Sequence, residues 1–461
     1  MKLSDRILSY MRENMTEVMH TTLNPDGPGV VRIHLIPPDI EEGALESSVA
    51  IINGQDVVPI GLSWSIILSE FIKQVNVYHG QAITDDDAKL IMDKTCVEVR
   101  KIYRFLPKRV IKRDIYTIMN SFVAIARGEA PDEEVSYLSM GEYARYMKAP
   151  HRMDLLVSAM TKDGSWHCNQ QCVHCYAAGQ ELVSEKELST EEWKRIIDKC
   201  RMAGIPQVTF TGGEPTMRDD LVELIDHSRW FVTRLNTNGI KLTKELCEEL
   251  VNASLDSCQI TFYSCDEEIH NKLVGAPQYK NTLAGIENAL AAGLNISINT
   301  PLCTLNKDYK KTLEFLHEKG VTYVTCSGLI TTGNACGEES INMQLSKDEI
   351  KAVLKEAVDY CYSHDMEISF TSPGWIEEEF FEENGLSKPS CGACLSNMAV
   401  TPGGNVVPCQ SYLSDKPLGN MFTDDWSKIW KNERTVAHRE FSAKMTGLCP
   451  LRIKEGGERH A

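Results

Sequence analysis

Residues 151 to about 375 alternate between short apolar runs and longer stretches in which apolar residues recur every three or four positions. The short runs predict seven strands, near 154–161, 207–212, 232–237, 257–264, 295–300, 322–327 and 367–372. The longer stretches predict intervening helices, two of them opened by capping boxes, Ser189 with Glu192 and Ser346 with Glu349. Buried parallel strands joined by helices predict an α/β barrel or open sheet whose ligands lie at the carboxyl ends of the strands.

Residues 1–150 have a different pattern. They predict a helix over 3–19, a strand over 30–36, a hairpin over 48–60 turning at Asn53-Gly54, and helices near 63–77, 84–104 and 107–128. A polar, breaker-rich linker runs from Gly128 to about 150. The pattern indicates a mostly helical N-terminal domain, which is either a module that recognises a peptide or a cap on the barrel.

Composition limits the possible functions of the 461 residues. The net charge is -17, with 48 Lys and Arg against 65 Asp and Glu, and this weighs against a nucleic-acid partner. No apolar run is long enough to cross a bilayer, and residues 1–6 lead into an amphipathic stretch without an apolar signal core. The sequence therefore predicts a cytoplasmic protein, in which clustered cysteines indicate a metal site or catalysis rather than disulfides.

Three closely spaced cysteines follow the first predicted barrel strand. Cys168, Cys172 and Cys175 have the spacing C-x3-C-x2-C, so one short loop could wrap around a metal cluster. Three thiolates can hold three irons of a cubane and leave the fourth iron open to an outside ligand. A structural zinc site would need a fourth protein ligand, which His167 or His174 could supply.

The second predicted barrel strand runs into Gly212-Gly213-Glu214-Pro215. The two glycines would let the main chain approach a ligand without a side chain in the way. Glu214 offers an anion to an ammonium group.

The cysteine triplet after one strand and the Gly-Gly-Glu turn after the next resemble the radical S-adenosylmethionine (radical SAM) enzymes. The resemblance implies a partial (β/α)6 barrel and a 4Fe–4S cluster whose open iron is chelated by S-adenosylmethionine. It also implies an electron donor of the flavodoxin or ferredoxin type. By the same resemblance, Thr261 at the end of the fourth strand would meet the ribose and His174 would pack on the adenine.

Residues 376–461 carry a second group of cysteines. Cys391, Cys394 and Cys409 surround an apolar strand and a turn, with Gly404 four residues before Cys409, and Cys449 follows near the end. The segment resembles the SPASM or twitch extension, which holds auxiliary Fe–S clusters. The dense run of further cysteines in a full SPASM tail is missing here, and four thiols suffice for one auxiliary cluster. A zinc site with the same four thiolates is the alternative.

The resemblance implies reductive cleavage of S-adenosylmethionine to a 5′-deoxyadenosyl radical that abstracts hydrogen from a substrate. SPASM-type relatives mostly cross-link, epimerise or oxidise peptides or proteins, and some act on tetrapyrroles. The prediction is therefore a peptide or protein maturase, with oxidation or decarboxylation of a tetrapyrrole or another small molecule as the alternative. An electron-transfer protein without radical chemistry would leave the Gly-Gly-Glu turn without a purpose.

Two further thiols are candidates for donating a hydrogen atom to a substrate radical. Cys265 directly follows the fourth predicted strand and Cys326 ends the sixth, so both are expected near the barrel mouth. The alternative is that each is a small apolar residue at a strand end, as free cysteines usually are.

Overall fold

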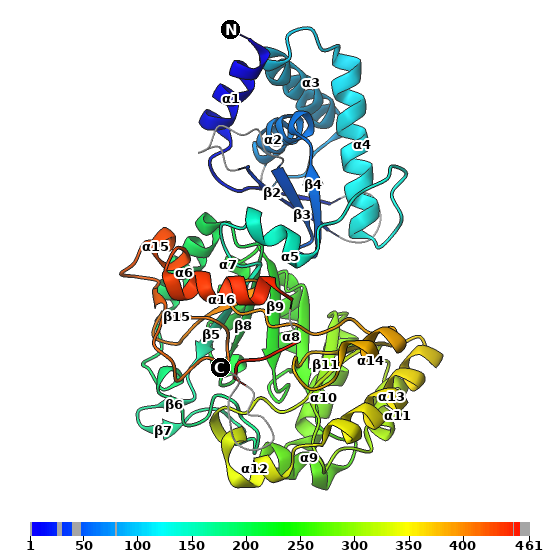
Figure 1. Ribbon diagram of the computed structural model, residues 1–461, viewed down its shortest axis with the longest axis vertical. Helices are drawn as coiled ribbons and strands as arrows, with labels where there is room; N and C mark the ends of the chain where they lie inside the picture. Colours follow the sequence, from blue (N-terminus) through cyan, green and yellow to red (C-terminus); the bar gives the residue numbers. More distant parts are fainter. Residues whose placement is uncertain (1, 25–29, 39–47, 79–80, 446, 452–461) are drawn as a thin grey trace. The chain divides into compact units, whose positions relative to one another are not determined.

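The computed structural model of the protein describes residues 2–24, 30–38, 48–78, 81–445 and 447–451 (Figure 1). It contains two compact units. Unit 1 comprises residues 1–151 and 200–206, and unit 2 comprises residues 152–199 and 207–461.

Unit 1 combines an antiparallel sheet with helices, and the sheet order is β1-β2-β3-β4. Its elements are α1 (Leu3–Asn14), β1 (Met19–Leu23), β2 (Val31–Ile36), β3 (Ser48–Ile52), β4 (Asp56–Ile60), α2 (Leu62–Asn76), α3 (Asp85–Ile102), α4 (Lys108–Ala126) and α5 (Met140–Tyr143). The predicted hairpin is confirmed; Asn53 and Gly54 both have positive φ, at 46° and 64°, inside the turn that the amide of Gln55 closes on the carbonyl of Ile52. Strand β1 was not predicted, because its first residue, Met19, continues the apolar spacing of the preceding helix.

Unit 2 is organised around one ten-stranded sheet with the order β13-β12-β11-β10-β9-β8-β5-β14-β15-β16. The seven strands predicted from the sequence are β5 (Arg152–Ser158), β8 (Gln207–Gly212), β9 (Val232–Thr237), β10 (Ser257–Thr261), β11 (Ile296–Pro301), β12 (Tyr323–Ser327) and β13 (Glu367–Phe370). All seven pair in parallel, which confirms the predicted α/β class. Among the described residues the sheet stays open between its edge strands β13 and β16, so the barrel is partial.

Helices connect the parallel strands (Figure 1). They are α6 (Thr190–Ala203), α7 (Leu221–His227), α8 (Lys244–Asn252), α9 (Glu267–Val274), α10 (Tyr279–Ala291), α11 (Tyr309–Glu318), α12 (Glu338–Asn342) and α13 (Lys347–Ser363). Both predicted capping boxes form, at Ser189 with Glu192 and at Ser346 with Glu349. No helix in the described ranges is long and apolar enough to cross a membrane.

The two faces of the parallel sheet differ in chemistry. One face is apolar and fully buried, with the side chains of Leu155, Phe210, Leu235, Ile260, Ile298 and Val324. The strand register places polar residues on the other face, among them Asp154, Thr209, Arg234, Asn236, Gln259, Thr261, Asn299 and Thr325. Gln259 of β10 reaches Thr325 of β12 across β11, with 3.2 Å between Nε2 and Oγ1, so the sheet curves toward its polar face.

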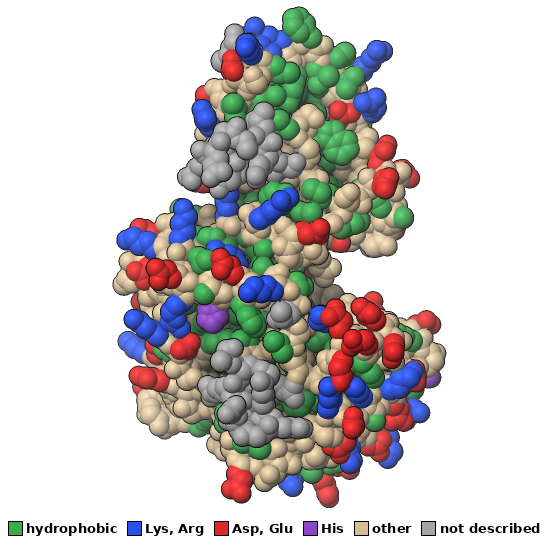
Figure 2. Space-filling model, in the orientation of Figure 1, with side chains coloured by type: hydrophobic (Ala, Val, Ile, Leu, Met, Phe, Trp, Pro, Cys, Tyr) green, Lys and Arg blue, Asp and Glu red, His purple; other side chains and the backbone are tan. Residues whose placement is uncertain are grey.

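The C-terminal extension continues the same sheet instead of forming a separate unit. Strand β14 (Asn397–Val400) pairs in parallel with β5, and β15 (Asn405–Val407) and β16 (Gly419–Asn420) extend the edge in antiparallel order. Helices α14 (Glu378–Glu383), α15 (Trp426–Trp430) and α16 (Glu433–Ala443) flank these strands in the sequence. Figure 2 shows acidic side chains gathered over α14, the solvated helix that its run of glutamates predicts.

Candidate active site

The loop that carries Cys168, Cys172 and Cys175 follows β5 and the hairpin of β6 (Thr161–Lys162) and β7 (Ser165–Trp166). The indole Nε1 of Trp166 donates to the carbonyl of Gln170 at 2.8 Å. The main-chain amides of Gln171 and Val173 donate to carbonyls at the end of α9, both at 3.0 Å. The main chain therefore holds the loop in place beside α9.

The three thiols of this loop lie close to one another and to Glu214. Burial, together with the charges of Glu214 and Cys175, raises the pKa of Cys168 to about 12. Burial also raises the pKa of Cys172, with added repulsion from Cys175 and Cys168. Such thiols ionise readily only beside positive charge, which iron would supply.

The described residues include no group of three His, Cys, Asp or Glu side chains that converges on a single metal ion. Each thiolate of a cubane binds a different iron, so cluster ligands need not converge as the ligands of one zinc ion must. The three cysteines therefore fit an Fe–S cluster around which the loop wraps.

Glu214 is the only one of the predicted cofactor residues with a complete set of hydrogen bonds around it in the described structure. Its Oε1 accepts from the hydroxyls of Thr216 and Thr237, both at 2.6 Å, and its Oε2 accepts from the main-chain amide of Asn238 at 2.8 Å. Only 1% of the residue is exposed, and burial raises its pKa while these hydrogen bonds lower it. No Lys, Arg or His of the described residues forms an ion pair with Glu214, so the carboxylate fits a ligand ammonium.

The structure requires glycine at the two positions before Glu214 for a different reason from the predicted approach to a ligand. A Cβ at Gly212 would lie 2.3 Å from the carbonyl oxygen of Ser158, and a Cβ at Gly213 would lie 2.9 Å from that of Ala159. The φ of Gly212 is +133°, which side chains also disfavour. The glycines therefore let the ends of β5 and β8 close together, and their contact with a cofactor stays a prediction.

A second link ties the turn region to the cysteine loop. The side-chain amide of Asn238 donates to Oδ1 of Asn169 at 2.6 Å, and Asn169 directly follows Cys168. The Sγ of Cys168 lies 3.4 Å from the carbonyl of Gly213. These contacts bring the predicted cluster ligands and the predicted ammonium ligand into one site, as the sequence led us to expect.

His174 and Thr261 border this site. His174 is buried, and its Nδ1 lies 3.2 Å from the hydroxyl of Ser340 in α12. Burial lowers its pKa to about 4, so a neutral imidazole is available to pack on an apolar ring. Thr261 lies half-buried on the polar face at the end of β10. Their roles toward adenine and ribose remain predictions.

The two candidate donor thiols differ in position. Cys326 is fully buried on the apolar face of β12 beside Cys361 of α13, so the expectation that it reaches the barrel mouth is wrong. Side chains alternate along a strand, and Cys326 shares the face of Val324. Cys265 is half-buried after β10, where its main chain contacts Tyr279 of α10 and Thr312 of α11. A donor role for Cys265 stays a prediction.

Three of the four tail cysteines, Cys391, Cys409 and Cys449, belong to one hydrophobic cluster that also contacts the cysteine loop. Cys391 belongs to its core, and Cys409, Cys449, Cys168 and Cys175 pack against it. Burial raises the pKa of Cys409, and repulsion from Cys391 and Cys449 raises it further. Burial raises the pKa of Cys394 to about 12, while Arg439 acts in the opposite direction.

One side chain connects the two groups of cysteines. Tyr176 follows Cys175, and its hydroxyl donates to Oε1 of Gln410 at 3.3 Å. Gln410 follows Cys409. Burial raises the pKa of Tyr176, with contributions from the charges of Cys175, Asp154 and Cys409.

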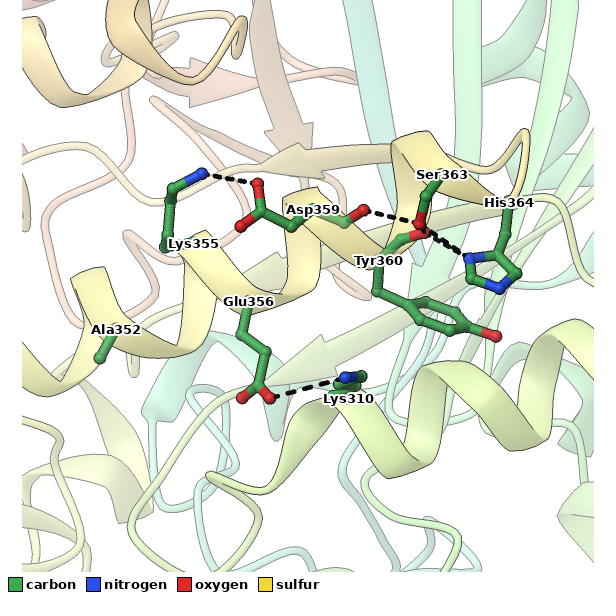
Figure 3. Close-up of a pocket in the computed structure, with 8 residues that line it drawn as sticks. All are labelled: Lys310, Ala352, Lys355, Glu356, Asp359, Tyr360, Ser363 and His364. Atoms are coloured by element: carbon green, nitrogen blue, oxygen red, sulfur yellow. Dashed lines mark hydrogen bonds and ion pairs between the residues drawn. The ribbon is translucent and has the colours of Figure 1, made fainter.

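A surface pocket lies elsewhere, between α11 and α13 on the helical side of the sheet (Figure 3). Its charged residues pair with one another, Lys355 with Asp359 at 2.6 Å and Lys310 with Glu356 at 3.9 Å. The sheet separates this pocket from the polar face, so it is not part of the candidate active site.

Family models match two parts of the chain. The model of the radical SAM superfamily matches residues 167–316, and that of the iron–sulfur cluster-binding SPASM domain matches residues 391–451. An AdoMet-dependent heme synthase of Methanosarcina barkeri (strain Fusaro / DSM 804) is 34% identical over 305 residues, which are 62% of this chain and 85% of that protein. The chain belongs to the radical SAM superfamily. It is therefore an enzyme that uses a 4Fe–4S cluster with S-adenosylmethionine, and its SPASM domain implies auxiliary Fe–S binding.

Two further similar proteins act on or bind peptides according to their names. PqqA peptide cyclase of Streptomyces rochei is 26% identical over 304 residues, which are 64% of this chain and 80% of that protein. The crystal structure of Streptococcus suis SuiB bound to precursor peptide SuiA has a TM-score of 0.57 with 14% identity, over 85% of this chain and 86% of that chain. At this identity the SuiB match shows a shared fold.

Sequence reasoning missed Arg234, Gln259 and Thr237 as site residues. For Arg234 and Gln259, the signal was the polar residue at every second position of β9 and β10, because strands buried on both faces read as continuous apolar runs. Thr237 lies on the opposite face of β9, together with Leu235, and had no such signal. The alternation marks the polar face of the sheet.

Proposed function

We propose that this radical SAM enzyme is a maturase that modifies a peptide or protein substrate. Cys168, Cys172 and Cys175 would hold the 4Fe–4S cluster, and Glu214 would bind the ammonium group of S-adenosylmethionine. Cys391, Cys394, Cys409 and Cys449 would hold one auxiliary Fe–S cluster. An electron donor of the flavodoxin or ferredoxin type would supply the reducing electron.

When bound, the cluster and S-adenosylmethionine supply a 5′-deoxyadenosyl radical that abstracts a hydrogen atom from the substrate. The chain itself positions the reacting groups. Glu214 orients the amino acid end of S-adenosylmethionine, since Thr216, Thr237 and Asn238 fix its carboxylate. The neutral ring of His174 and the buried Tyr263, with centroids 6.5 Å apart, offer an apolar wall that excludes water.

The observation that carries the peptide assignment is the presence of unit 1. Unit 2 makes up about two-thirds of the chain, so a match to SuiB over 85% of the chain has to include part of unit 1. SuiB is a protein crystallised with a precursor peptide. This match therefore favours the interpretation of unit 1 as a peptide-recognition module over its interpretation as a cap on the barrel.

Unit 1 also offers a surface suited to an extended peptide. Strand β1 is an edge strand of this sheet, and Nδ2 of Asn76 donates there to the carbonyl of His20 at 2.8 Å. At the opposite edge, the amide of Leu138 donates to the carbonyl of Val57 in β4, and Pro59 provides no N–H there. An edge strand can accept a peptide as an added strand.

A small-molecule substrate, in particular a tetrapyrrole, is the second candidate. The heme synthase relative has higher identity, 34%, than the peptide cyclase, 26%. Its match spans 62% of the chain, a smaller share than the 85% that SuiB covers.

The test uses 5′-deoxyadenosine release by the anaerobically reconstituted, reduced enzyme. Extracts from a strain of the source organism that lacks this gene would be added, either intact or after digestion with an immobilised protease. Stimulation that protease treatment removes is the expected result. Stimulation that survives protease and follows the solvent-extracted tetrapyrroles would contradict the peptide assignment and favour the second candidate.

A further inference from the structure

The polar face of the sheet contains an arginine whose charge is not compensated by the described residues. Arg234 is the third residue of β9, and its register neighbours are Thr209 of β8 and Ser257 of β10. Its side chain is half-buried, and no residue of the described ranges gives its guanidinium a hydrogen bond or an ion pair. Arginine has five N–H donors, so this position leaves a strong anion-binding group unused.

The surroundings of Arg234 carry an excess of positive charge. Burial lowers its pKa, nearby Arg152 lowers it further, and Tyr323 and Asp154 act in the opposite direction. Asp154 already pairs with Arg152 at 2.8 Å and is itself 1% exposed. This layer of the polar face thus has two cations and one anion. A partly desolvated cation without a counter-ion is costly, and a bound anion would relieve that cost.

Amide side chains line the path from Arg234 toward the carboxyl ends of the strands. Asn236 follows on the same face of β9, and Gln259 lies beside it on β10. Thr325 accepts from Nε2 of Gln259 at 3.2 Å and donates to Oδ1 of Asn299 at 3.0 Å. That chain leaves Oε1 of Gln259 and Nδ2 of Asn299 for another partner. The face suits a polar group that both donates and accepts.

The rise per residue of β9 gives the distance from Arg234 to the proposed S-adenosylmethionine site. Thr237, whose hydroxyl contacts Glu214, lies three residues further along β9, with its side chain on the opposite face of the strand. At about 3.3 Å per residue, the two positions are roughly 10 Å apart along the strand. A substrate anchored at Arg234 could therefore extend its reacting carbon toward the candidate active site.

We propose that Arg234 binds a carboxylate of the substrate and so sets how deeply the substrate enters the polar face of the sheet. The planar fork of arginine matches a carboxylate through two parallel hydrogen bonds. This inference rests on the proposed function, which makes the carboxylate an acidic side chain or the C-terminus of a peptide. A tetrapyrrole would offer the same chemistry through a propionate.

The test measures equilibrium binding to the reconstituted holoenzyme with S-adenosylmethionine, under anaerobic conditions. The probes are N-acetylglutamate N-methylamide, its glutamine counterpart, which differs only in the charge, and coproporphyrin III. The variants are Arg234→Gln, Arg234→Lys and the control Lys241→Gln, which removes a positive charge from the exposed connection after β9.

Wild type and Lys241→Gln are expected to bind the glutamate probe at least about tenfold more tightly than the glutamine probe. Arg234→Gln should lose this preference, and Arg234→Lys should keep part of it, because the charge remains and the fork is lost. Circular dichroism and Tm of Arg234→Gln should match wild type, since no described partner is lost.

Four other results are informative, and three of them would overturn the proposal. Equal binding of both amino acid probes, combined with coproporphyrin binding that Arg234→Gln leaves unchanged, would overturn the proposal, as would no binding of any probe. A clear fall in the Tm of Arg234→Gln would also overturn it, since the residue would then be structural. Coproporphyrin binding that depends on Arg234 without a glutamate preference would support the carboxylate site and contradict the peptide substrate.

Discussion

Members of both groups of cysteines pack in one apolar cluster, and the two groups differ in what surrounds them. The loop group has three thiols, and the nearest strand end presents a buried carboxylate without a cation, Glu214. The tail group has four thiols, and the residues beside it, Tyr412 and Arg439, are an aromatic ring and a cation. Three ligands leave a cubane iron open, whereas four ligands close it. The difference separates a site that can bind a substrate from one that can only hold metal or pass electrons.

The largest effect should come from removing the loop thiols. The triple substitution of Cys168, Cys172 and Cys175 by Ala should abolish 5′-deoxyadenosine formation, because no protein ligand remains for the open-iron cluster. The same variant should retain about four irons in the tail, the content of one cubane.

Product chromatography and iron analysis of the reconstituted protein measure both quantities. The matched control is the tail triple substitution of Cys391, Cys394 and Cys409 by Ala, which should lose the auxiliary iron. Continued 5′-deoxyadenosine release by the loop variant would rule out the loop assignment. Retained zinc without iron in that variant would show that the tail is a zinc site.

The next effect concerns Glu214. Glu214→Gln keeps the shape and removes the charge that would face the ammonium group, so the Kd for S-adenosylmethionine should rise by about tenfold to a hundredfold. Isothermal titration of the reconstituted protein measures it. Glu268→Gln, a change at an exposed position of α9, is the control. An unchanged Kd in Glu214→Gln would remove the main distinction between the two sites.

A smaller effect is expected from removing a side chain that anchors the tail cysteines but not the loop cysteines. Glu185 accepts hydrogen bonds from Thr401, Gly403 and Asn405, at the turn between β14 and β15. Glu185→Ala should destabilise the protein by about 1–3 kcal/mol and speed iron release from the tail. Glu181→Ala, at an exposed position nearby, should do neither. Urea titration and the rate of iron chelation measure these effects, and faster iron loss from the loop would contradict the assignment of the anchor.

The smallest effect is a pH dependence on the loop side. Burial lowers the pKa of His270 in α9 from 6.5 to about 4, and its Nδ1 accepts from the amide of Tyr263. The unfolded chain takes up this proton below about pH 6.5 and the folded chain does not, so the stability present above pH 6.5 is lost as the pH falls toward 4. At pH 5.5 the loss should be about 1 kcal/mol.

Comparing urea midpoints at pH 7.5 and pH 5.5 measures this loss. His270→Asn keeps an acceptor for Tyr263 and should flatten the dependence. The half-buried His438 near the tail, whose pKa burial also lowers, is the comparison, and His438→Asn should change the dependence less. An unaltered pH dependence in His270→Asn would show that other groups carry it.

Much of this arrangement follows from local sequence signals, and the rest depends on long-range pairing. The seven strands, the hairpin at Asn53-Gly54 and the capping boxes have strong periodic or turn signatures. The parallel pairing of β14 with β5 joins residues about 250 positions apart, which no local pattern encodes. The position of Cys326 was misjudged because strand ends were considered without strand faces; its parity with Val324 contained the answer.

The central claim is that only the loop cluster binds S-adenosylmethionine. Electron paramagnetic resonance of the reduced protein, before and after adding S-adenosylmethionine, tests it in the two triple variants. The tail variant, which keeps only the loop cluster, should show a spectrum that S-adenosylmethionine changes. The loop variant, which keeps only the tail cluster, should show a spectrum that does not respond. A response of the tail cluster, or no response of the loop cluster, would contradict the account.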